Sequence, residues 1–258
     1  MTLIHPTAVV SPNAKLGSGC TIGPYCVIGD DISLGDECWL HSHVVIEGPT
    51  RIGSGNRFFP FSSIGQVTQD LKYRGEPTYL EIGDHNTFRE YVTINRGTGM
   101  NEKTTVGSHN TILAYSHIAH NCALGDHIVM SNCATLAGHV IIEDRAVIGG
   151  LAAIHQFCRI GKMAIVGGCS KVVQDVPPFM LADGNPAEVR TVNKVGLERN
   201  GIDEQTQESL KKAYKYLYRT STYNIQDALA KILHDAGQFE EIKHLVQFVA
   251  QSERGISR

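Results

Sequence analysis

A six-residue repeat of large apolar residues restricts the fold of this chain more than any other feature of its sequence. Apolar residues stand at every sixth position from Ile4 to Ile64 and again from Val106 to Val172. Glycine often follows the apolar residue, and the residue four positions after it is usually small, as at Cys122 and Ala134. Helices repeat about every 3.6 residues and strands about every two, so neither produces this period. The repeat instead predicts a solenoid of short strands.

Each hexapeptide is expected to form one flat side of a three-sided parallel β-helix. The large apolar residue points inward, the glycine turns the corner, and the small residue takes the next inward position. Three hexapeptides complete one coil, so each residue lies over the residue eighteen positions further along the chain. Residues far apart in the sequence therefore stand in columns along the outside of the coils.

Two interruptions and one change of pattern divide the chain. The repeats are replaced near 65–81 and near 96–105, and a solenoid expels such insertions as loops, often on its binding face. We therefore assign residues 1–185 to a β-helix domain with two loops. Residues 186–258 follow the apolar spacing of helices, most clearly from Leu210 to Tyr218. The predicted fold class is mainly β, with a C-terminal α-helical domain that caps the last coil.

One column of the predicted β-helix contains residue types suited to catalysis. His120, Gly138 and Gln156 are each eighteen residues apart, and three more histidines, His117, His139 and His155, lie in the same coils. Adjacent strands are about 4.8 Å apart, so the column is roughly 10 Å tall. An imidazole, a glycine N–H and an amide in one column form a candidate site.

This column favours a reaction without a covalent protein intermediate. Histidine is the side chain best suited to taking a proton near neutral pH. No Ser-His-Asp or Gly-x-Ser-x-Gly arrangement is visible, and most of the seven cysteines occupy the small inward position, where they are expected to fill the core. His120 is therefore expected to deprotonate an acceptor that attacks an activated acyl group directly. The N–H of Gly138 is then available to the tetrahedral intermediate.

The competing interpretation of the histidines is a zinc site, because three histidines and a water are a known catalytic set. His120 and His139, however, differ in their position within the repeat, and Gln156 stands where a metal would need a ligand. We therefore predict no metal.

Composition and charge limit the partners and the compartment. The net charge of −3 gives no indication of nucleic-acid binding, and no run of about 18 apolar residues predicts membrane insertion. The chain enters the repeat at its first residues without a signal-peptide pattern, and its odd number of cysteines suits a reducing compartment. These features predict a cytoplasmic protein.

Several motifs on this framework are more specific than the repeat. They are Gln69-Asp-Leu-Lys-Tyr-Arg-Gly-Glu-Pro-Thr78, His117-Ile-Ala-His-Asn-Cys122, Ala134-Thr-Leu-Ala-Gly-His139, His155-Gln-Phe-Cys158 and Val166-Gly-Gly-Cys-Ser170. Together they resemble the UDP-N-acetylglucosamine acyltransferases that begin lipid A synthesis, and the resemblance runs nearly end to end.

The resemblance implies a cytoplasmic homotrimer of left-handed β-helices with active sites between subunits. Its members transfer a 3-hydroxyacyl chain from acyl carrier protein to the sugar 3-position of UDP-N-acetylglucosamine, with no cofactor besides the carrier-bound donor. By match, His120 resembles the general base, Gly138 the oxyanion donor, and Gly168 the residue that limits acyl-chain length. The positions that match substrate-binding residues are Gln69, Asp70, Lys72, His117, His139, His155, Gln156, Asn193 and Arg199.

Two residues depart from the family pattern: Asn121 replaces an Asp beside the base, and Asn95 replaces a His at the sugar-binding wall. The second departure leaves a 3-amino sugar open as the acceptor. The sequence is also compatible with N-acylation of the later glucosamine intermediate, with a coenzyme A-dependent acetyltransferase, and with a non-catalytic solenoid that only binds partners.

Overall fold

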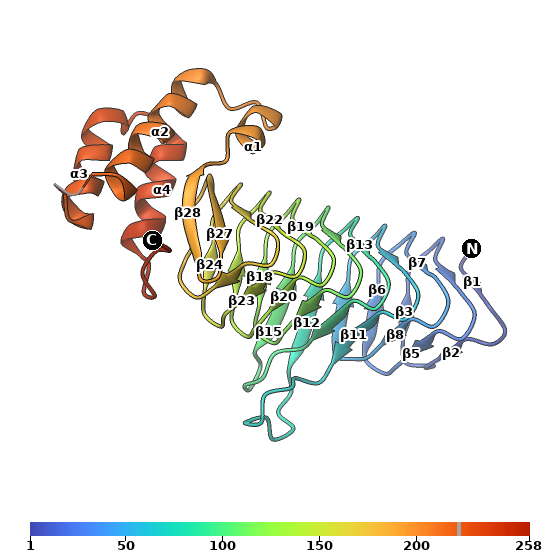
Figure 1. The fold of residues 1–258 in the computed structure, drawn as a ribbon. Coiled ribbons are helices and arrows are strands. Elements are labelled where there is room, and N and C mark those ends of the chain that lie inside the picture. The colour runs from blue at the N-terminus through green and yellow to red at the C-terminus, as the bar shows by residue number, and fades with distance from the viewer. Residues whose placement is uncertain (221–222) are drawn as a thin grey trace.

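The computed structural model describes residues 1–220 and 223–258. The chain forms a left-handed parallel β-helix followed by a group of helices, which confirms the predicted fold class (Figure 1). Three sheets form the three faces of the β-helix, and each coil contributes one strand to each sheet in the order A, B, C.

The strands are short, and most have two residues. Sheet A consists of β1 (Leu3–Ile4), β4 (Thr21–Ile22), β7 (Trp39–Leu40), β10 (Arg57–Phe58), β13 (Thr87–Phe88), β16 (Thr111–Ile112), β19 (Val129–Met130), β22 (Val147–Ile148), β25 (Ile165–Val166), β27 (Met180–Gly184) and β28 (Ala187–Val192). Sheet B consists of β2 (Val9–Val10), β5 (Val27–Ile28), β8 (Val45–Ile46), β11 (Ser63–Gln66), β14 (Thr93–Asn95), β17 (His117–Ile118), β20 (Thr135–Leu136), β23 (Ala153–Ile154) and β26 (Lys171–Val172). Sheet C consists of β3 (Lys15–Leu16), β6 (Ile32–Leu34), β9 (Thr50–Ile52), β12 (Tyr79–Ile82), β15 (Lys103–Val106), β18 (Ala123–Leu124), β21 (Ile141–Ile142) and β24 (Arg159–Ile160).

The apolar residues of the repeat fill the interior of the β-helix. Ile118 pairs in register with Leu136, and Leu136 with Ile154, and all three side chains are buried. Full burial of such a side chain contributes about 1.5–3 kcal/mol relative to leaving it in water. A shift of register by one residue would expose every one of them, so the packing fixes which residues stack.

The corners of the coils require a backbone conformation that is costly for residues other than glycine. Asn121, His139 and Phe157, on successive coils, have φ of 61°, 60° and 65°. The left-handed conformation costs roughly 1–2 kcal/mol per residue. Hydrogen bonds between coils offset this cost, since the His139 N–H donates to the His120 carbonyl at 3.1 Å and the Phe157 N–H to the Gly138 carbonyl at 3.2 Å.

Both insertions leave the β-helix at the same corner, between sheets B and C, which we call the B–C corner. The first, 67–78, joins β11 to β12, and the second, 96–102, joins β14 to β15; the first protrudes clearly in Figure 1. Both are shorter than the predicted loops because β11, β12 and β15 extend beyond the two-residue pattern. The stacking continues across both loops, as Ile82 pairs with Ile52 on one side and Val106 on the other.

The C-terminal part begins with a hairpin and continues as helices. β27 pairs with β25 in parallel and with β28 in antiparallel fashion. The helices are α1 (Lys194–Arg199), α2 (Glu204–Tyr218), α3 (Ile225–Ala236) and α4 (Glu240–Ala250). The sequence analysis placed 187–192 in the helical domain, but these residues form β28 because their alternating side chains pack against β27. Among the described residues, no helix is long and apolar enough to cross a lipid bilayer.

Candidate active site at the B–C corner

The predicted column lies on the B–C corner. His120, Gly138 and Gln156 follow β17, β20 and β23, which pair in register. The His120 imidazole lies directly against Gly138: a Cβ added to this glycine would stand 2.5 Å from Cε1 and 2.6 Å from Nε2 of the ring. Only glycine leaves room for the imidazole in this position.

Hydrogen bonding between coils leaves the Gly138 N–H free. The flanking N–H groups of Ala137 and His139 donate to backbone carbonyls, whereas the Gly138 N–H donates to no group within residues 1–220 and 223–258. A buried N–H without a partner is uncommon and can donate a hydrogen bond to a ligand oxygen at little cost. The column therefore places a free donor beside the imidazole.

The first loop carries an acidic side chain to the same place. Asp70 Oδ2 lies 4.0 Å from His120 Nε2, and the two side chains are 25% and 15% exposed. The Thr68 hydroxyl accepts a hydrogen bond from the Asp70 N–H at 3.1 Å, and Asp70 Oδ1 accepts one from the Lys72 N–H at 2.9 Å. These contacts hold the carboxylate beside Nε2.

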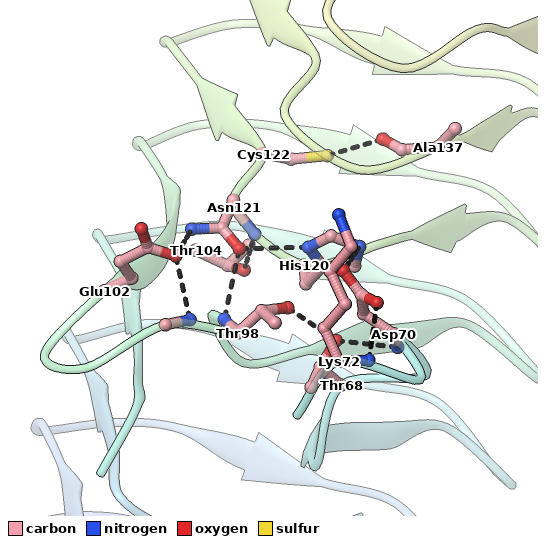
Figure 2. Close-up of polar contacts among 11 residues, drawn as sticks. Thr68, Asp70, Lys72, Thr98, Glu102, Thr104, His120, Asn121, Cys122 and Ala137 are labelled. Atoms are coloured by element: carbon pink, nitrogen blue, oxygen red, sulfur yellow. Dashed lines mark hydrogen bonds and ion pairs between the residues drawn. The ribbon is translucent and has the colours of Figure 1, made fainter. Parts of the chain in front are cut away.

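On the other side of the ring, Asn121 fixes which nitrogen carries the proton. Asn121 Oδ1 lies 2.9 Å from His120 Nδ1 and also accepts a hydrogen bond from the Thr98 N–H at 3.1 Å (Figure 2). An amide oxygen can only accept, so Nδ1 must carry a proton to complete this hydrogen bond. Nε2 is then left with its lone pair, which is the form that a general base requires.

Two further histidines lie beside His120 as neutral groups. His139 meets the His120 ring edge-on, with 5.3 Å between ring centroids, and His117 Nδ1 lies 2.7 Å from the Thr93 hydroxyl. Burial, and then the charge of His120, lowers the pKa of both side chains. Both are therefore neutral near pH 7 and can act as hydrogen-bonding groups.

Comparisons with known proteins identify the family. Residues 175–257 match the model for domain 2 of UDP-N-acetylglucosamine O-acyltransferase, and residues 1–30 match the bacterial transferase hexapeptide repeat. A relative from Gloeothece citriformis, named as an O-acyltransferase acting between acyl-loaded acyl carrier protein and UDP-N-acetylglucosamine, is 50% identical over 97% of this chain and 90% of that protein. A relative of the same name from Anaeromyxobacter is 47% identical over 99% of both chains. The chain belongs to the UDP-N-acetylglucosamine O-acyltransferase family.

Solved structures of this family have the same fold. The chain is similar to LpxA from Acinetobacter baumannii, with a TM-score of 0.96 and 42% identity over 99% of this chain and 100% of the other. It is also similar to the UDP-N-acetylglucosamine acyltransferase of Bacteroides fragilis, with a TM-score of 0.97 and 36% identity over the same shares.

Not every residue matched to the acyltransferase family lies at the B–C corner. Gln69, Lys72, His155 and Gln156 do, and all four are exposed there. The backbone of the next residue orients His155, since the His155 Nδ1 lies 3.1 Å from the Gln156 carbonyl.

The remaining three matched residues lie at the other two corners of the β-helix. Asn193 caps α1, and its side chain accepts a hydrogen bond from the Gly196 N–H. The same side chain donates a hydrogen bond of 2.8 Å to the carbonyl of Met163, which lies on the corner between sheets C and A. Arg199 is at the end of the same helix. Sheet C thus separates both from His120. Gly168 lies on the corner between sheets A and B, across sheet B from His120.

The cysteines lie as predicted for core fillers. Cys20, Cys26, Cys38, Cys122 and Cys158 are buried. Burial raises the pKa of the Cys122 thiol to about 12, so this thiol next to the column is not a nucleophile near neutral pH. In the part of the chain that the structure describes, no three His, Cys, Asp or Glu side chains form a group that could hold a metal ion.

Sequence reasoning missed the polar residues that hold the site together. Asn95, matched to a sugar-binding position, is buried and anchors the first loop by donating to the Val67 carbonyl at 2.9 Å. Thr98 and Glu102 of the second loop contact Asn121, and the sequence analysis singled out neither residue. Thr105 pairs with Ala123, so residues eighteen positions apart are stacked here as well. Glu102 is eighteen positions before His120, and extending the column by one coil would therefore have included it.

Proposed function

We propose that this protein transfers a 3-hydroxyacyl chain from acyl carrier protein to the 3-hydroxyl of UDP-N-acetylglucosamine, the first step of lipid A biosynthesis. Its family membership supports the two substrates. The observation that carries the mechanism is the His120 ring, which has Nε2 free and lies against Gly138, a residue whose N–H is unpaired.

In the proposed reaction the acceptor oxygen attacks the thioester carbonyl of the donor. His120 Nε2 takes the proton of the hydroxyl as the new C–O bond forms. The carbonyl oxygen becomes an oxyanion, which accepts a hydrogen bond from the Gly138 N–H. Such a hydrogen bond typically contributes about 10²–10³ in rate. The C–S bond then breaks, and the carrier thiolate leaves and takes the proton back from His120. Every atom comes from the two substrates, so no cofactor is needed.

Side chains around His120 suit a nucleotide sugar as acceptor. Asp70 Oδ2 lies 4.0 Å from Nε2, so a sugar hydroxyl at the base is within reach of its carboxylate. Exposed Gln69 and Lys72 on the same loop offer an amide and a cation. His117, His139 and Gln156 line the corner as neutral hydrogen-bonding groups, which position the substrate in this proposal.

Asn193 and Arg199 complete the nucleotide site only if they come from a neighbouring subunit, because sheet C separates them from the base of their own chain. The corner between sheets A and B supports an assembly, since it carries a row of exposed apolar side chains: Tyr25, Phe61, Tyr91, Tyr115 and Leu151. Closed rotational symmetry is the usual form of such assemblies. We propose a homotrimer in the cytoplasm, where the carrier-bound donor and a reducing environment for the thiols are found.

Charge introduced into this corner is expected to separate the subunits and abolish activity. Tyr115→Lys combined with Leu151→Lys places two cations in the apolar row, where they would lose hydration on assembly. Sedimentation should show a trimer for the wild type and a monomer with little activity for the variant. A fully active monomer would rule out a site shared between subunits.

The chain-length prediction concerns Gly168, which is exposed and has an ordinary backbone conformation. A Cβ there meets only the Gly150 carbonyl, at 3.3 Å, so the position is open. Gly168→Met is expected to shift preference toward shorter 3-hydroxyacyl donors, because each methylene that cannot be buried loses about 0.8 kcal/mol. Rates with a series of donors on both proteins measure this, and an unchanged ranking would place the end of the groove elsewhere.

An acyl-transfer assay tests the function and separates it from its competitors. The purified protein is given hydroxyacyl-loaded carrier protein with UDP-N-acetylglucosamine, its 3-amino analogue, or the later glucosamine intermediate. We expect the hydroxyl acceptor to give the highest kcat/KM. Higher kcat/KM with the 3-amino sugar would assign N-acylation, and no transfer to any of them would favour a binding solenoid.

A further inference from the structure

We propose that Glu102 is a positioning residue for the base: through the amide of Asn121, its carboxylate holds the His120 ring with Nε2 free and faces the imidazolium that forms during the reaction. This inference rests on the proposed function, in which His120 takes the proton. It assigns a catalytic contribution to the second loop, which no motif indicated.

Three contacts hold the Asn121 amide in one orientation (Figure 2). Its Oδ1 accepts from the Thr98 N–H at 3.1 Å and pairs with His120 Nδ1 at 2.9 Å. Its Nδ2 donates to Glu102 Oε2 at 2.7 Å. A flipped amide would place its NH₂ group against the Thr98 N–H and its oxygen against the carboxylate, and both contacts would be repulsive. Glu102 and Thr98 therefore determine that an oxygen, not an NH₂ group, faces the base.

The Glu102 carboxylate is itself fixed and ionised. The Gly99 N–H donates to Oε2 at 2.8 Å, so the turn of the second loop holds the side chain against Asn121. The Gly99 N–H and then the Asn121 amide lower the pKa of Glu102. The carboxylate is thus negative at the pH of the reaction, one coil below the base.

The Glu102 carboxylate matters because Asn121, the residue in contact with His120 Nδ1, carries no charge. An asparagine can orient an imidazole, but it cannot supply negative charge to the imidazolium. Glu102 supplies that charge through the amide, from the Nδ1 side of the ring, where substrate does not bind. The charged and titratable groups that face His120 are Asp70, Lys72, Glu102, His117 and His139. Asp70 faces Nε2, where the acceptor must enter, so Glu102 is the carboxylate that stays free of substrate.

Glu102→Gln tests the charge while keeping an oxygen that can accept from Asn121. We expect kcat to fall about three- to tenfold and the acid limb of the pH–rate profile to move to lower pH by about half a unit, since the imidazolium loses a facing carboxylate. KM for the nucleotide sugar should not change, because Glu102 lies on the far side of the ring. Glu81→Gln is the matched control: it removes an equal charge one coil lower in sheet C, where Glu81 pairs with Lys103 at 2.6 Å.

A double-mutant cycle with Asn121→Asp separates catalytic positioning from a structural role. Alone, Asn121→Asp sets two carboxylates against each other at the 2.7 Å contact and should reduce activity. In the Glu102→Gln background the new carboxylate reaches His120 directly, so activity and the acid limb should recover. A loss due only to loop disorder would not be rescued by a second substitution.

The outcomes distinguish this inference from the function on which it rests. If the wild type transfers no acyl chain, the proposed function fails. If the wild type is active and Glu102→Gln retains the wild-type kcat and pH profile, Glu102 is not a positioning residue. If both substitutions lower activity additively, with no rescue in the double variant, the proposed coupling through Asn121 is wrong.

Discussion

His120→Ala is expected to lower kcat by about 10²–10⁴ and to leave the fold intact, because general-base contributions are of this size. The imidazole projects outward from the B–C corner, and its side-chain contacts there are with Asp70, Asn121, Gly138 and His139, so the apolar core loses nothing. Steady-state rates with carrier-bound donor measure the loss, and circular dichroism and sedimentation check the fold.

His127→Ala serves as the matched control for this variant. His127 is a corner histidine too, but it stands exposed on the corner between sheets C and A, where it stacks on His109. Its removal should change kcat by less than about twofold, as expected for a surface side chain away from the site. A folded His120→Ala variant that is as active as His127→Ala would remove His120 from the role of base.

Gly138→Ala is expected to reduce kcat by about 10²–10³, within the range of general-base contributions, because the variant keeps its backbone N–H but displaces the His120 ring. The added Cβ would stand 2.5–2.6 Å from the His120 ring, so the imidazole must move away from its place beside Gly138. Gly138 does not have a positive φ, and the backbone therefore tolerates alanine. The loss should come from the displaced ring and not from unfolding, which thermal melts of the variant would test.

The clash at Gly138 also predicts how the two substitutions combine. With the ring absent in His120→Ala, nothing obstructs the new methyl group, so adding Gly138→Ala should cost far less than it does in the wild type. Residues in contact usually show this non-additivity. Independent, fully additive losses would mean that Gly138 and His120 do not act together.

The sequence was sufficient to predict the β-helix and the column because both follow from one period. Inward residues such as Ile118 and Leu136 are buried only in one register, and that register places Gly138 over His120. The insertions could be located because they interrupt the period. The course of the chain within the insertions could not be predicted, since hydrogen bonds such as those of Glu102 and Asn95 depend on loop geometry that no repeat determines.

The C-terminal part was harder to predict for a different reason. Residues 187–192 alternate buried and exposed side chains at the start of the segment, but the helical spacing that follows is longer and dominated the prediction. Asn193 and Arg199 were matched to the substrate site, yet within one chain they lie across sheet C from His120. Sequence spacing cannot indicate which residues meet only between subunits.

A single turnover followed by mass spectrometry tests direct acyl transfer. The wild-type protein is mixed with an equal amount of hydroxyacyl-loaded carrier protein and with UDP-N-acetylglucosamine, and the masses of protein and sugar are followed in time. We expect acylated UDP-N-acetylglucosamine to form while the mass of the protein stays unchanged, and His120→Ala to form the same product far more slowly. An acyl group that appears first on the protein, for instance on Cys133 or Cys169, and then passes to the sugar would contradict direct attack assisted by His120.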